Sequence, residues 1–344
     1  SMITLLGGFA LLLAGAIFLG SCEGPAGPQG PPGTDGIDGV NGENGSDGTD
    51  GVAGNAVCME CHTLDVKAAV TAQWKLSTHG IGATAARGSR VACAKCHAHE
   101  GFVETVWTGQ DTTATAIAFP QKIQCKTCHD FHSSLDFENE PNSAIRTTEA
   151  VTLMTGGEVE FANAESNLCM NCHQSRHAAP DDSDGDAPIE VWGHFGPHHG
   201  PQGNFINGLV GYEFGASLGT SGSHESMSSC VYCHMVESPA DTTGGHTWKP
   251  TLESCTACHP DATDYDVGGV VTEIEGLLAT LKTALGDMLD EDGDVIEDVF
   301  YSADSVGAAW NYVLVMEDAS TGIHNPAYAK ALLNNSINYL TGAK

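Results

Sequence analysis

The sequence contains the pattern Cys-x-x-Cys-His six times, and the repeats use twelve of its thirteen cysteines. Two thiols at this spacing can each bond to one vinyl group of a haem, and the histidine that follows then lies beside the iron. Zinc sites and disulfides, the competing interpretations, do not require a histidine after every pair. The pattern therefore predicts six covalently attached haem c groups, held by Cys58, Cys61, Cys93, Cys96, Cys125, Cys128, Cys169, Cys172, Cys230, Cys233, Cys255 and Cys258.

The histidine of each motif is predicted to be the first axial ligand of its iron, and the second ligand decides what that haem can do. Two histidines on one iron give a centre that passes electrons, whereas an open position would permit catalysis. Ten histidines lie outside the motifs, which is enough for six irons, and their pairing with the irons stays open. The predicted first ligands are His62, His97, His129, His173, His234 and His259.

The six motifs lie within residues 55–266, a stretch of about 212 residues. About 35 residues per haem are too few to bury an ordinary apolar core, so the porphyrins must supply much of the buried surface. We therefore predict a mainly α-helical, haem-packed fold with extensive irregular structure. Short helices are expected at the attachment sites, and few or no strands.

Residues 267–344 carry no haem motif and show the apolar periodicity of helices. One helix is predicted from Val270 to Met288, ended by the acidic segment 290–294, and a second is predicted around Trp310. A third is predicted to begin with Asn325 as its N-cap and Pro326 in its first turn. This C-terminal helical segment is expected to pack on the haem-binding domain.

An apolar run from Met2 to Leu19 leads into Leu19-Gly20-Ser21-Cys22, which matches a bacterial lipobox. The match predicts a lipoprotein signal peptide over residues 1–21 and a lipid on the thiol of Cys22, hence an outer-membrane or cell-surface lipoprotein. The alternative is a membrane-spanning helix, since about 18 apolar residues suffice to cross a bilayer. Export agrees with the attachment of haem to such motifs, which occurs outside the cytoplasm.

Glycine occupies every third position from Gly24 to Gly54. Only glycine fits the axis of a collagen triple helix, so a collagen-like, trimer-forming segment is one interpretation. The later triplets are poor in proline, and a disordered spacer is the other interpretation. In either case residues 22–54 are predicted to form a stalk between the lipid and the haem-binding domain.

The chain has 13 Lys+Arg against 44 Asp+Glu, a formal net charge of −31. Nucleic acid is excluded as a partner because phosphate binding needs a basic surface. The charge favours cationic partners and divalent ions. The acidic segment 182–186 suggests calcium, but it lacks the spacing of an EF-hand loop, so a solvated loop is the favoured interpretation.

Five segments carry a further likeness: Trp74–His79, Cys128–His132, Gly196–Gly200, Cys233–Met235 with Gly245–Trp248, and Ser320–Pro326. The first four resemble multihaem c-type cytochromes of metal- and sulfate-reducing bacteria, including filament-forming outer-surface cytochromes. The last is similar to the C-terminal part of pentahaem nitrite reductases. The resemblance implies that the second ligands are His79, His132, His198, His224, His246 and His324. His99, His194 and His199 are alternative candidates for a second ligand, and His177 is the weakest candidate.

The resemblance implies an electron carrier rather than an enzyme, relaying electrons through closely spaced haems at the cell surface. Its expected partners are other multihaem cytochromes and extracellular acceptors such as ferric minerals. A filament subunit is compatible with this role, although a lipid anchor and stalk fit a tethered monomer or trimer better. The alternative is a nitrite or hydroxylamine reductase with one open haem. Ammonia-forming nitrite reductases usually replace the motif histidine of the catalytic haem by lysine, and all six motifs here keep histidine.

Overall fold

The computed structural model describes residues 64–130, 145–181, 187–215, 218, 224, 229–237 and 242–343. The chain divides into two compact units, Ser1–Gly51 and Val52–Lys344, and all the described residues belong to the second. Several predicted features lie outside the described residues. They are the signal peptide, Cys22, the Gly-x-y stalk, Cys58, Cys61, His62, His132 and the acidic segment 182–186.

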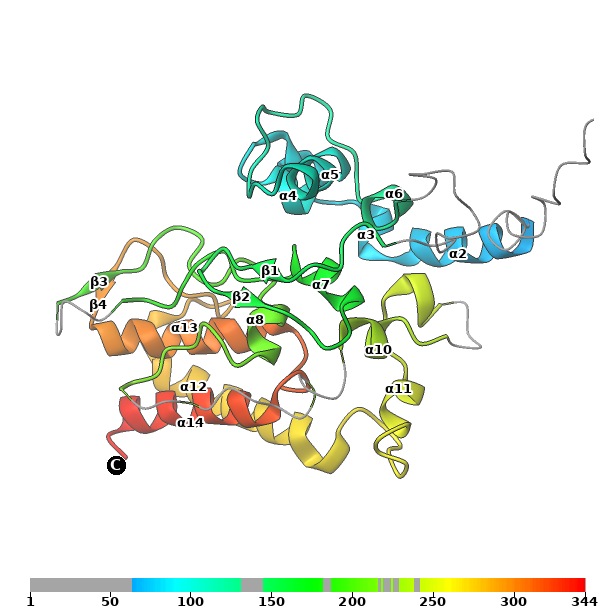
Figure 1. The fold of residues 1–344 in the computed structure, drawn as a ribbon. Coiled ribbons are helices and arrows are strands. Elements are labelled where there is room, and N and C mark those ends of the chain that lie inside the picture. Colours follow the sequence, from blue (N-terminus) through cyan, green and yellow to red (C-terminus); the bar gives the residue numbers. More distant parts are fainter. Residues whose placement is uncertain are drawn as a thin grey trace, which may run out of the picture. The chain divides into compact units, whose positions relative to one another are not determined.

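The first described part of the chain consists of short helices joined by irregular segments (Figure 1). Local capping explains two of the helix ends. The hydroxyl of Ser77 accepts a hydrogen bond from the Gly80 N–H, and α5 ends where Gly109 takes a left-handed conformation with φ 67°. The elements are α2 (Leu64–Leu76), α3 (Thr78–Ile81), η1 (Ala85–Ser89), α4 (Ala94–His97), α5 (His99–Thr108) and α6 (Cys125–Cys128).

The middle of the chain alternates one-turn helices with two small antiparallel sheets. Val151 pairs with Val159 in one sheet, and Ile189 pairs with Tyr301 in the other. The strands are β1 (Val151–Thr152), β2 (Glu158–Val159), β3 (Ile189–Glu190) and β4 (Phe300–Tyr301). The helices are α7 (Glu165–Met170), α8 (Gln202–Ile206), α10 (Cys230–His234), η2 (Gly245–Thr247) and α11 (Leu252–Thr256). The predicted mainly α-helical, irregular fold with few strands is confirmed.

Each described Cys-x-x-Cys-His motif overlaps, wholly or in part, with a helix of four to six residues. Close backbone contacts hold some of these short helices in place. A Cβ atom on Gly101 of α5 would lie 2.2 Å from the carbonyl oxygen of Ala94 in α4, so glycine is required where these two helices cross. The predicted short helices at the attachment sites are therefore present in the five described motifs.

The C-terminal part contains three helices of 16 residues: α12 (Val270–Leu285), α13 (Ala303–Asp318) and α14 (Pro326–Thr341). The predicted N-cap of α14 is confirmed, because the Asn325 side chain accepts a hydrogen bond from the Tyr328 N–H at 3.1 Å. The first of these helices ends at Leu285, three residues before the predicted end at Met288. Gly286, with φ 52°, ends α12, and Met288 lies in the following 3-10 turn η4 (Gly286–Met288), before the acidic segment. A short turn η3 (Val267–Gly269) precedes α12.

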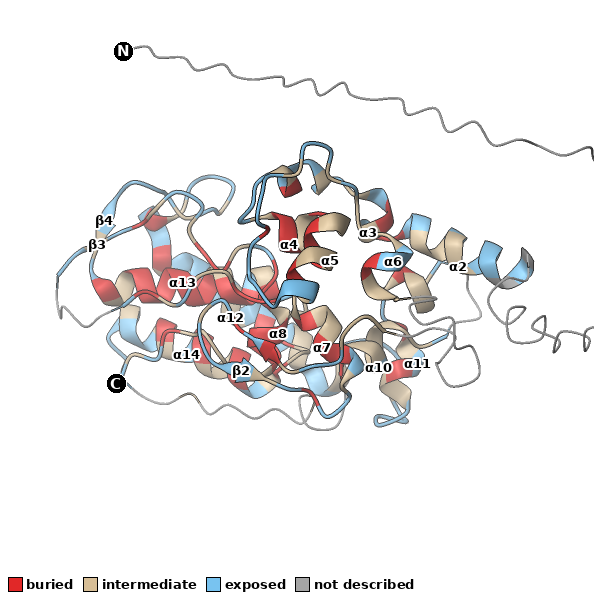
Figure 2. Cartoon of the chain, turned by 45° about the horizontal axis from the view of Figure 1, so that its top comes forward, coloured by how far each residue is buried: buried red, intermediate tan, exposed pale blue. Residues whose placement is uncertain are grey.

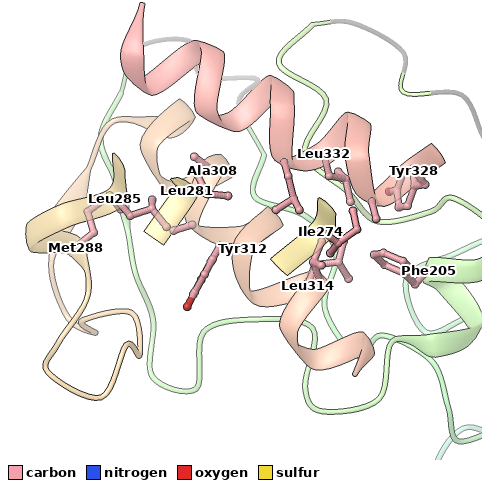
Figure 3. Close-up of a cluster of buried hydrophobic side chains, with 14 residues drawn as sticks. Phe205, Ile274, Leu281, Leu285, Met288, Ala308, Tyr312, Leu314, Tyr328 and Leu332 are labelled. Atoms are coloured by element: carbon pink, nitrogen blue, oxygen red, sulfur yellow. The ribbon is translucent and has the colours of Figure 1, made fainter. Parts of the chain in front are cut away.

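The largest buried apolar cluster lies between these three helices (Figures 2 and 3). Leu281 from α12, Leu314 from α13 and Leu332 from α14 are fully buried, and Phe205 from α8 joins them. A second, smaller cluster forms around the first sheet and α7, from Val151, Leu153, Phe161, Met170 and Ile206.

Buried polar side chains tie the segment after α8 to the C-terminal helices. The Asn311 side chain accepts the Tyr212 N–H at 2.8 Å and donates to the Tyr212 carbonyl oxygen at 2.9 Å. The indole N–H of Trp310 donates to the Val210 carbonyl oxygen at 2.7 Å. Each of these buried polar groups is satisfied, so the contacts fix the segment's position. A boundary between residues 266 and 267 stays a prediction. Among the described helices, none is both long and apolar enough to cross a membrane.

Candidate haem-ligand centres

Each of the five described motif histidines has the imidazole ring of a second histidine about 6 Å away. The two rings of each pair come from segments far apart in the sequence, except for His259 and His224. Their centroids are separated by 6.4 Å in His97–His198, 6.1 Å in His129–His246, 6.1 Å in His173–His79, 6.2 Å in His234–His324 and 6.3 Å in His259–His224.

This spacing fits one metal ion between the two rings. A bond from a metal to an imidazole nitrogen is about 2.0–2.1 Å, so two imidazoles on opposite sides of one metal have centroids roughly 6.3 Å apart. Each ring can turn about its own metal bond, so the observed interplanar angles of 38° to 81° are compatible with such an arrangement. The five pairs therefore have the geometry that a doubly ligated iron requires.

Five of the six histidines predicted as second ligands occupy these pairs. His132 and the motif histidine His62 lie outside the described residues. The other histidines contact different groups: His99 bonds to the Thr127 hydroxyl at 2.8 Å, and His199 pairs with Glu317 at 2.6 Å. The backbone N–H of His194 donates to Glu297, and the His177 ring lies 6.2 Å from that of Trp192.

The Nδ1 atoms of several paired rings bond to groups that lie away from the ring pair. The group is a backbone carbonyl for His234 (Trp248, 2.8 Å) and for His224 (Ile323, 2.6 Å). A ring that donates its Nδ1 hydrogen to such an acceptor presents its other nitrogen, Nε2, as a metal ligand. Three further Nδ1 contacts are His97 to Thr84 Oγ1 at 3.1 Å, His173 to Gln202 Oε1 at 3.0 Å and His324 to Asp318 Oδ1 at 2.7 Å.

The local backbone explains how some of these rings are held. His198 has φ 75° and its neighbours His194 and His199 have φ 62° and 50°, a left-handed conformation that is uncommon outside glycine. Such conformations persist where the surrounding structure fixes them, often at functional sites. The N–H of His246 donates to the Gln73 side chain at 3.1 Å, which anchors this ring to α2.

Burial lowers the pKa of several of the paired rings, which favours the neutral form in which histidine binds a metal. Removal from water lowers the pKa of His79 to about 4, helped by the nearby His173, and it likewise lowers the pKa of His198 to about 4. The pKa of His324 is shifted in the opposite direction. Burial alone would lower its pKa, but the charge and hydrogen bond of Asp318 raise it above the ordinary value.

The five described motifs lie close to one another. The Cys96 thiol lies 4.0 Å from the carbonyl oxygen of Asn171, and the Cys172 thiol lies 3.7 Å from the carbonyl oxygen of Lys95, so the second and fourth motifs are in contact. The fourth and fifth motifs are also neighbours, because the Cys169 and Cys230 thiols lie beside each other. Helix α10 also packs against α7 and α11. The second, fourth, fifth and sixth motifs therefore follow one another in space, in that order.

Trp248 lies where three of the ring pairs meet. Its ring contacts that of His79 at a centroid distance of 4.8 Å and that of His246 at 5.6 Å. Its backbone carbonyl accepts the hydrogen bond from His234. One residue thus contacts the pairs of the third, fourth and fifth motifs.

The sequence did not identify the groups that hold the rings. Thr84, Gln202, Asp318 and Trp248 carry no motif of their own, and only Trp248 lay in a segment noted for its resemblance. One of these groups could have been suspected from the sequence: Asp318 lies only six residues before His324, the predicted iron ligand whose ring it holds. The remaining partners come from distant segments, where no local pattern exists.

No protein-family model matches this chain. Two C-type polyhaem cytochromes of Geobacter sulfurreducens, OmcB and OmcC, are 21% and 23% identical to it, each over 73% of its length. The chain spans 44% and 43% of the lengths of these two relatives, less than half in each case.

Two solved structures are also similar. The outer cell wall cytochrome OcwA is 20% identical with a TM-score of 0.49, covering 78% of this chain and 49% of that one. An undecahaem cytochrome from the S-layer of Carboxydothermus ferrireducens is 20% identical with a TM-score of 0.42, covering 80% and 40%. The resemblance of Ser320–Pro326 to nitrite reductases stays a prediction. By its motifs and its sequence relatives, this chain is related to the multihaem c-type cytochromes.

Proposed function

We propose that this chain binds six c haems, each with two histidine ligands, and that it relays electrons between them without binding a substrate at iron. The observation that carries the proposal is the spacing of the five ring pairs, 6.1 to 6.4 Å between centroids. Each pair uses one motif histidine and one other histidine, and no histidine is used twice. The first motif would then take His62 and His132 as its ligands, because His132 is the one candidate from the resemblance that is not otherwise paired.

The haem would supply the iron that accepts and releases one electron at a time. The residues of the chain do three things. The paired cysteines would attach each haem covalently, the two histidines of each pair would hold its iron, and the Nδ1 contacts would fix the orientation of the imidazole rings. An iron held by two histidines would offer no free position for nitrite or another small substrate.

The order of the motifs in space supports a continuous relay. The fourth motif, with His173 and His79, lies at the centre, because Cys172 contacts Cys96 of the second motif and Cys169 contacts Cys230 of the fifth. Trp248 brings the third motif to the same junction. The sixth motif follows the fifth through α11. Exposed cysteines, Cys125 of the third motif and Cys258 of the sixth, mark the two places where we propose that electrons enter and leave.

The partners that fit this role are other multihaem cytochromes and an extracellular acceptor such as a ferric mineral. We propose that the chain is exported and held at the cell surface by a lipid on Cys22, with the Gly-x-y stalk as a spacer. Self-association, as a trimer through the stalk or as a filament, is compatible with the same relay. The strong negative charge favours acceptors that are themselves cationic.

The spin state of the irons tests the proposal. We expect six covalently bound haems by mass spectrometry and only low-spin ferric signals in electron paramagnetic resonance, with fast oxidation of the reduced protein by ferric citrate. His79→Ala should open one iron and allow it to bind carbon monoxide. His99→Ala is the control, because the His99 ring bonds to the Thr127 hydroxyl and does not face a motif histidine. It should change neither the spin state of the irons nor their binding of carbon monoxide. A high-spin signal in the wild-type protein, or rapid turnover of nitrite, would favour the reductase alternative.

A further inference from the structure

One of the proposed ligands has a partner of a different chemical kind from the others. The Nδ1 atom of His324 lies 2.7 Å from Oδ1 of Asp318, a carboxylate with 0% of its side chain exposed. Four other paired rings have an uncharged Nδ1 partner: the Thr84 hydroxyl, the Gln202 amide oxygen and two backbone carbonyls. In contrast, Nδ1 of His79 is buried and makes no hydrogen bond to any described residue.

Helix stability does not explain why a carboxylate is buried here. Asp318 is the last residue of α13, where the helix dipole disfavours negative charge. Three hydrogen bonds hold it in position. The hydroxyl of Ser320 and its backbone N–H, the latter at 3.3 Å, donate to Oδ2, and the Gln202 side chain donates to the backbone oxygen of Asp318 at 3.2 Å. The carboxylate is thus fixed on the ring of His324, and the buried surroundings screen its charge less than water would.

A carboxylate that accepts the Nδ1 hydrogen makes a histidine ligand more basic. A more basic ligand donates more electron density to the iron and stabilises its ferric form more than its ferrous form. Hydrogen bonding to an axial ligand is one of the ways in which a protein sets the potential of a haem. We infer that Asp318 tunes the centre of the fifth motif, lowering its reduction potential below that of the adjacent centre of the fourth motif; this inference rests on the ligation proposed above.

Two neighbouring centres differ clearly in this respect. The fourth motif uses His79, with no partner on Nδ1, and the fifth uses His324, with a carboxylate. Gln202 connects them, since it bonds to the ring of His173 at 3.0 Å and also donates to the backbone oxygen of Asp318. The reduction potential would therefore differ between the fourth and fifth centres, with the fourth higher. Electrons on the protein would collect on the fourth motif rather than on the fifth.

The test is a redox titration of the Asp318→Asn protein carrying its haems, followed by absorbance and by electron paramagnetic resonance. We expect one of the midpoint potentials to rise, by the equivalent of about a tenfold change in its reduction equilibrium, or about 59 mV for one electron. All irons should stay low-spin, because His324 is retained. Glu317→Gln is the matched control: this neighbouring carboxylate pairs with His199, whose side chain is 79% exposed, and its loss should leave the midpoints in place.

Two further variants separate failure of this inference from failure of the proposed function. His324→Ala should make one iron high-spin; a fully low-spin spectrum would disprove the ligation itself. With that ligation intact, unchanged midpoints in Asp318→Asn, or equal shifts in Asp318→Asn and Glu317→Gln, would overturn the tuning role. If Asp318→Asn does not retain its haems, Ser320→Ala provides the test. This variant removes one of two donors to Oδ2 and the acceptor of the His324 N–H, while the Ser320 N–H still donates to Oδ2. A carboxylate with one donor fewer should bond more strongly to the His324 ring and lower the same midpoint potential, and a rise or no change would contradict the inference.

Discussion

The haem-motif helices and the three C-terminal helices build their interiors in different ways. Helices α12, α13 and α14 have 16 residues each and bury a continuous set of apolar side chains between them. The motif helices have four to six residues, and α6 buries only Thr127 while α10 buries no side chain. Isolated helices shorter than about 12 residues are marginal in water. If the motifs carry haem as proposed, helices such as α6 and α10 would depend on that attachment for their stability, whereas the C-terminal helices depend on each other.

The two kinds of structure meet in the segment from Asp318 to Asn325. Asn325 caps α14 and donates to the Ile206 carbonyl oxygen at 3.1 Å, while the preceding residue, His324, faces the motif histidine His234. The backbone oxygen of Ile323 accepts the hydrogen bond from His224. The apolar core thus positions proposed ligands of two irons, which links its stability to the haem centres.

The largest effect that we expect comes from removing the central haem. Replacing Cys169 and Cys172 by serine should abolish attachment at the fourth motif and loosen both of its neighbours, because these thiols contact Cys96 and Cys230. We expect a loss of more than one haem by mass spectrometry and rapid cleavage in limited proteolysis.

The matched control is the same double replacement in the sixth motif, at Cys255 and Cys258, the second of which is exposed. We expect this variant to lose one haem and to remain resistant to protease. Equal damage from the two double replacements would mean that the fourth motif is not the centre of the arrangement.

Truncation of the apolar core should cost stability without loss of haem. Leu332→Ala removes a fully buried side chain between the C-terminal helices and should lower the free energy of unfolding by about 2–5 kcal/mol. Leu76→Ala, at a side chain that is 47% exposed, should change it by less than about 0.5 kcal/mol. Denaturant titrations would measure both. A lower haem content of the Leu332 variant by mass spectrometry would show that attachment of haem itself requires an intact apolar core.

Loss of the cap on α14 should affect both regions. Asn325→Ala removes the cap and the bond to Ile206, at an expected cost of about 2 kcal/mol, and it should also alter the paramagnetic signal of the iron held by the adjacent His324. Ser302→Ala removes the corresponding cap of α13, away from any proposed ligand, and is the control. We expect it to lower stability without changing the spectrum; a spectral change in both variants would indicate a general loosening.

The smallest effect concerns the start of α12. The Asp266 carboxylate accepts hydrogen bonds from the Thr272 hydroxyl at 2.6 Å and the Val271 N–H at 2.7 Å, and the Thr272 bonds are the main cause of its lowered pKa. A lowered pKa in the folded state means that the ionised carboxylate stabilises the fold above its unfolded pKa of about 3.9 and loses this effect as the pH falls through the folded value. Asp266→Asn should therefore lower the midpoint of thermal unfolding slightly at pH 7. The difference from wild type should shrink in acid.

Glu275→Gln, on the exposed face of the same helix, controls for the loss of one negative charge. It should change the midpoint little at either pH. If the Asp266 variant showed the same difference from wild type at pH 7 and in strong acid, the hydrogen bonds of the ionised carboxylate would not be its source.

The features that the sequence could predict are the local ones. The spacing of two cysteines and a histidine fixes an attachment site within five residues, and the apolar period of α13 and α14 identifies a helix face within a few turns. Asn325 and Pro326 indicated the start of α14 for the same reason, because a cap acts on N–H groups of the adjacent turn. Gly286 ends α12 earlier than predicted, because its positive φ interrupts the helix although the apolar periodicity continues to Met288. Apolar periodicity alone therefore does not locate a helix end.

The tertiary structure alone decided which rings face each other. His246 lies closer in sequence to the motifs of His234 and His259, yet it faces His129, and His79 faces His173 rather than the nearer His97. The burial of Asp318 against His324 was likewise not apparent from the sequence. A second axial ligand approaches its iron through space from the opposite side of the porphyrin, so its separation along the chain is unconstrained. The predicted thioether bonds and first ligand lie within five consecutive residues, and this is why the sequence by itself determined where to place them, as a prediction.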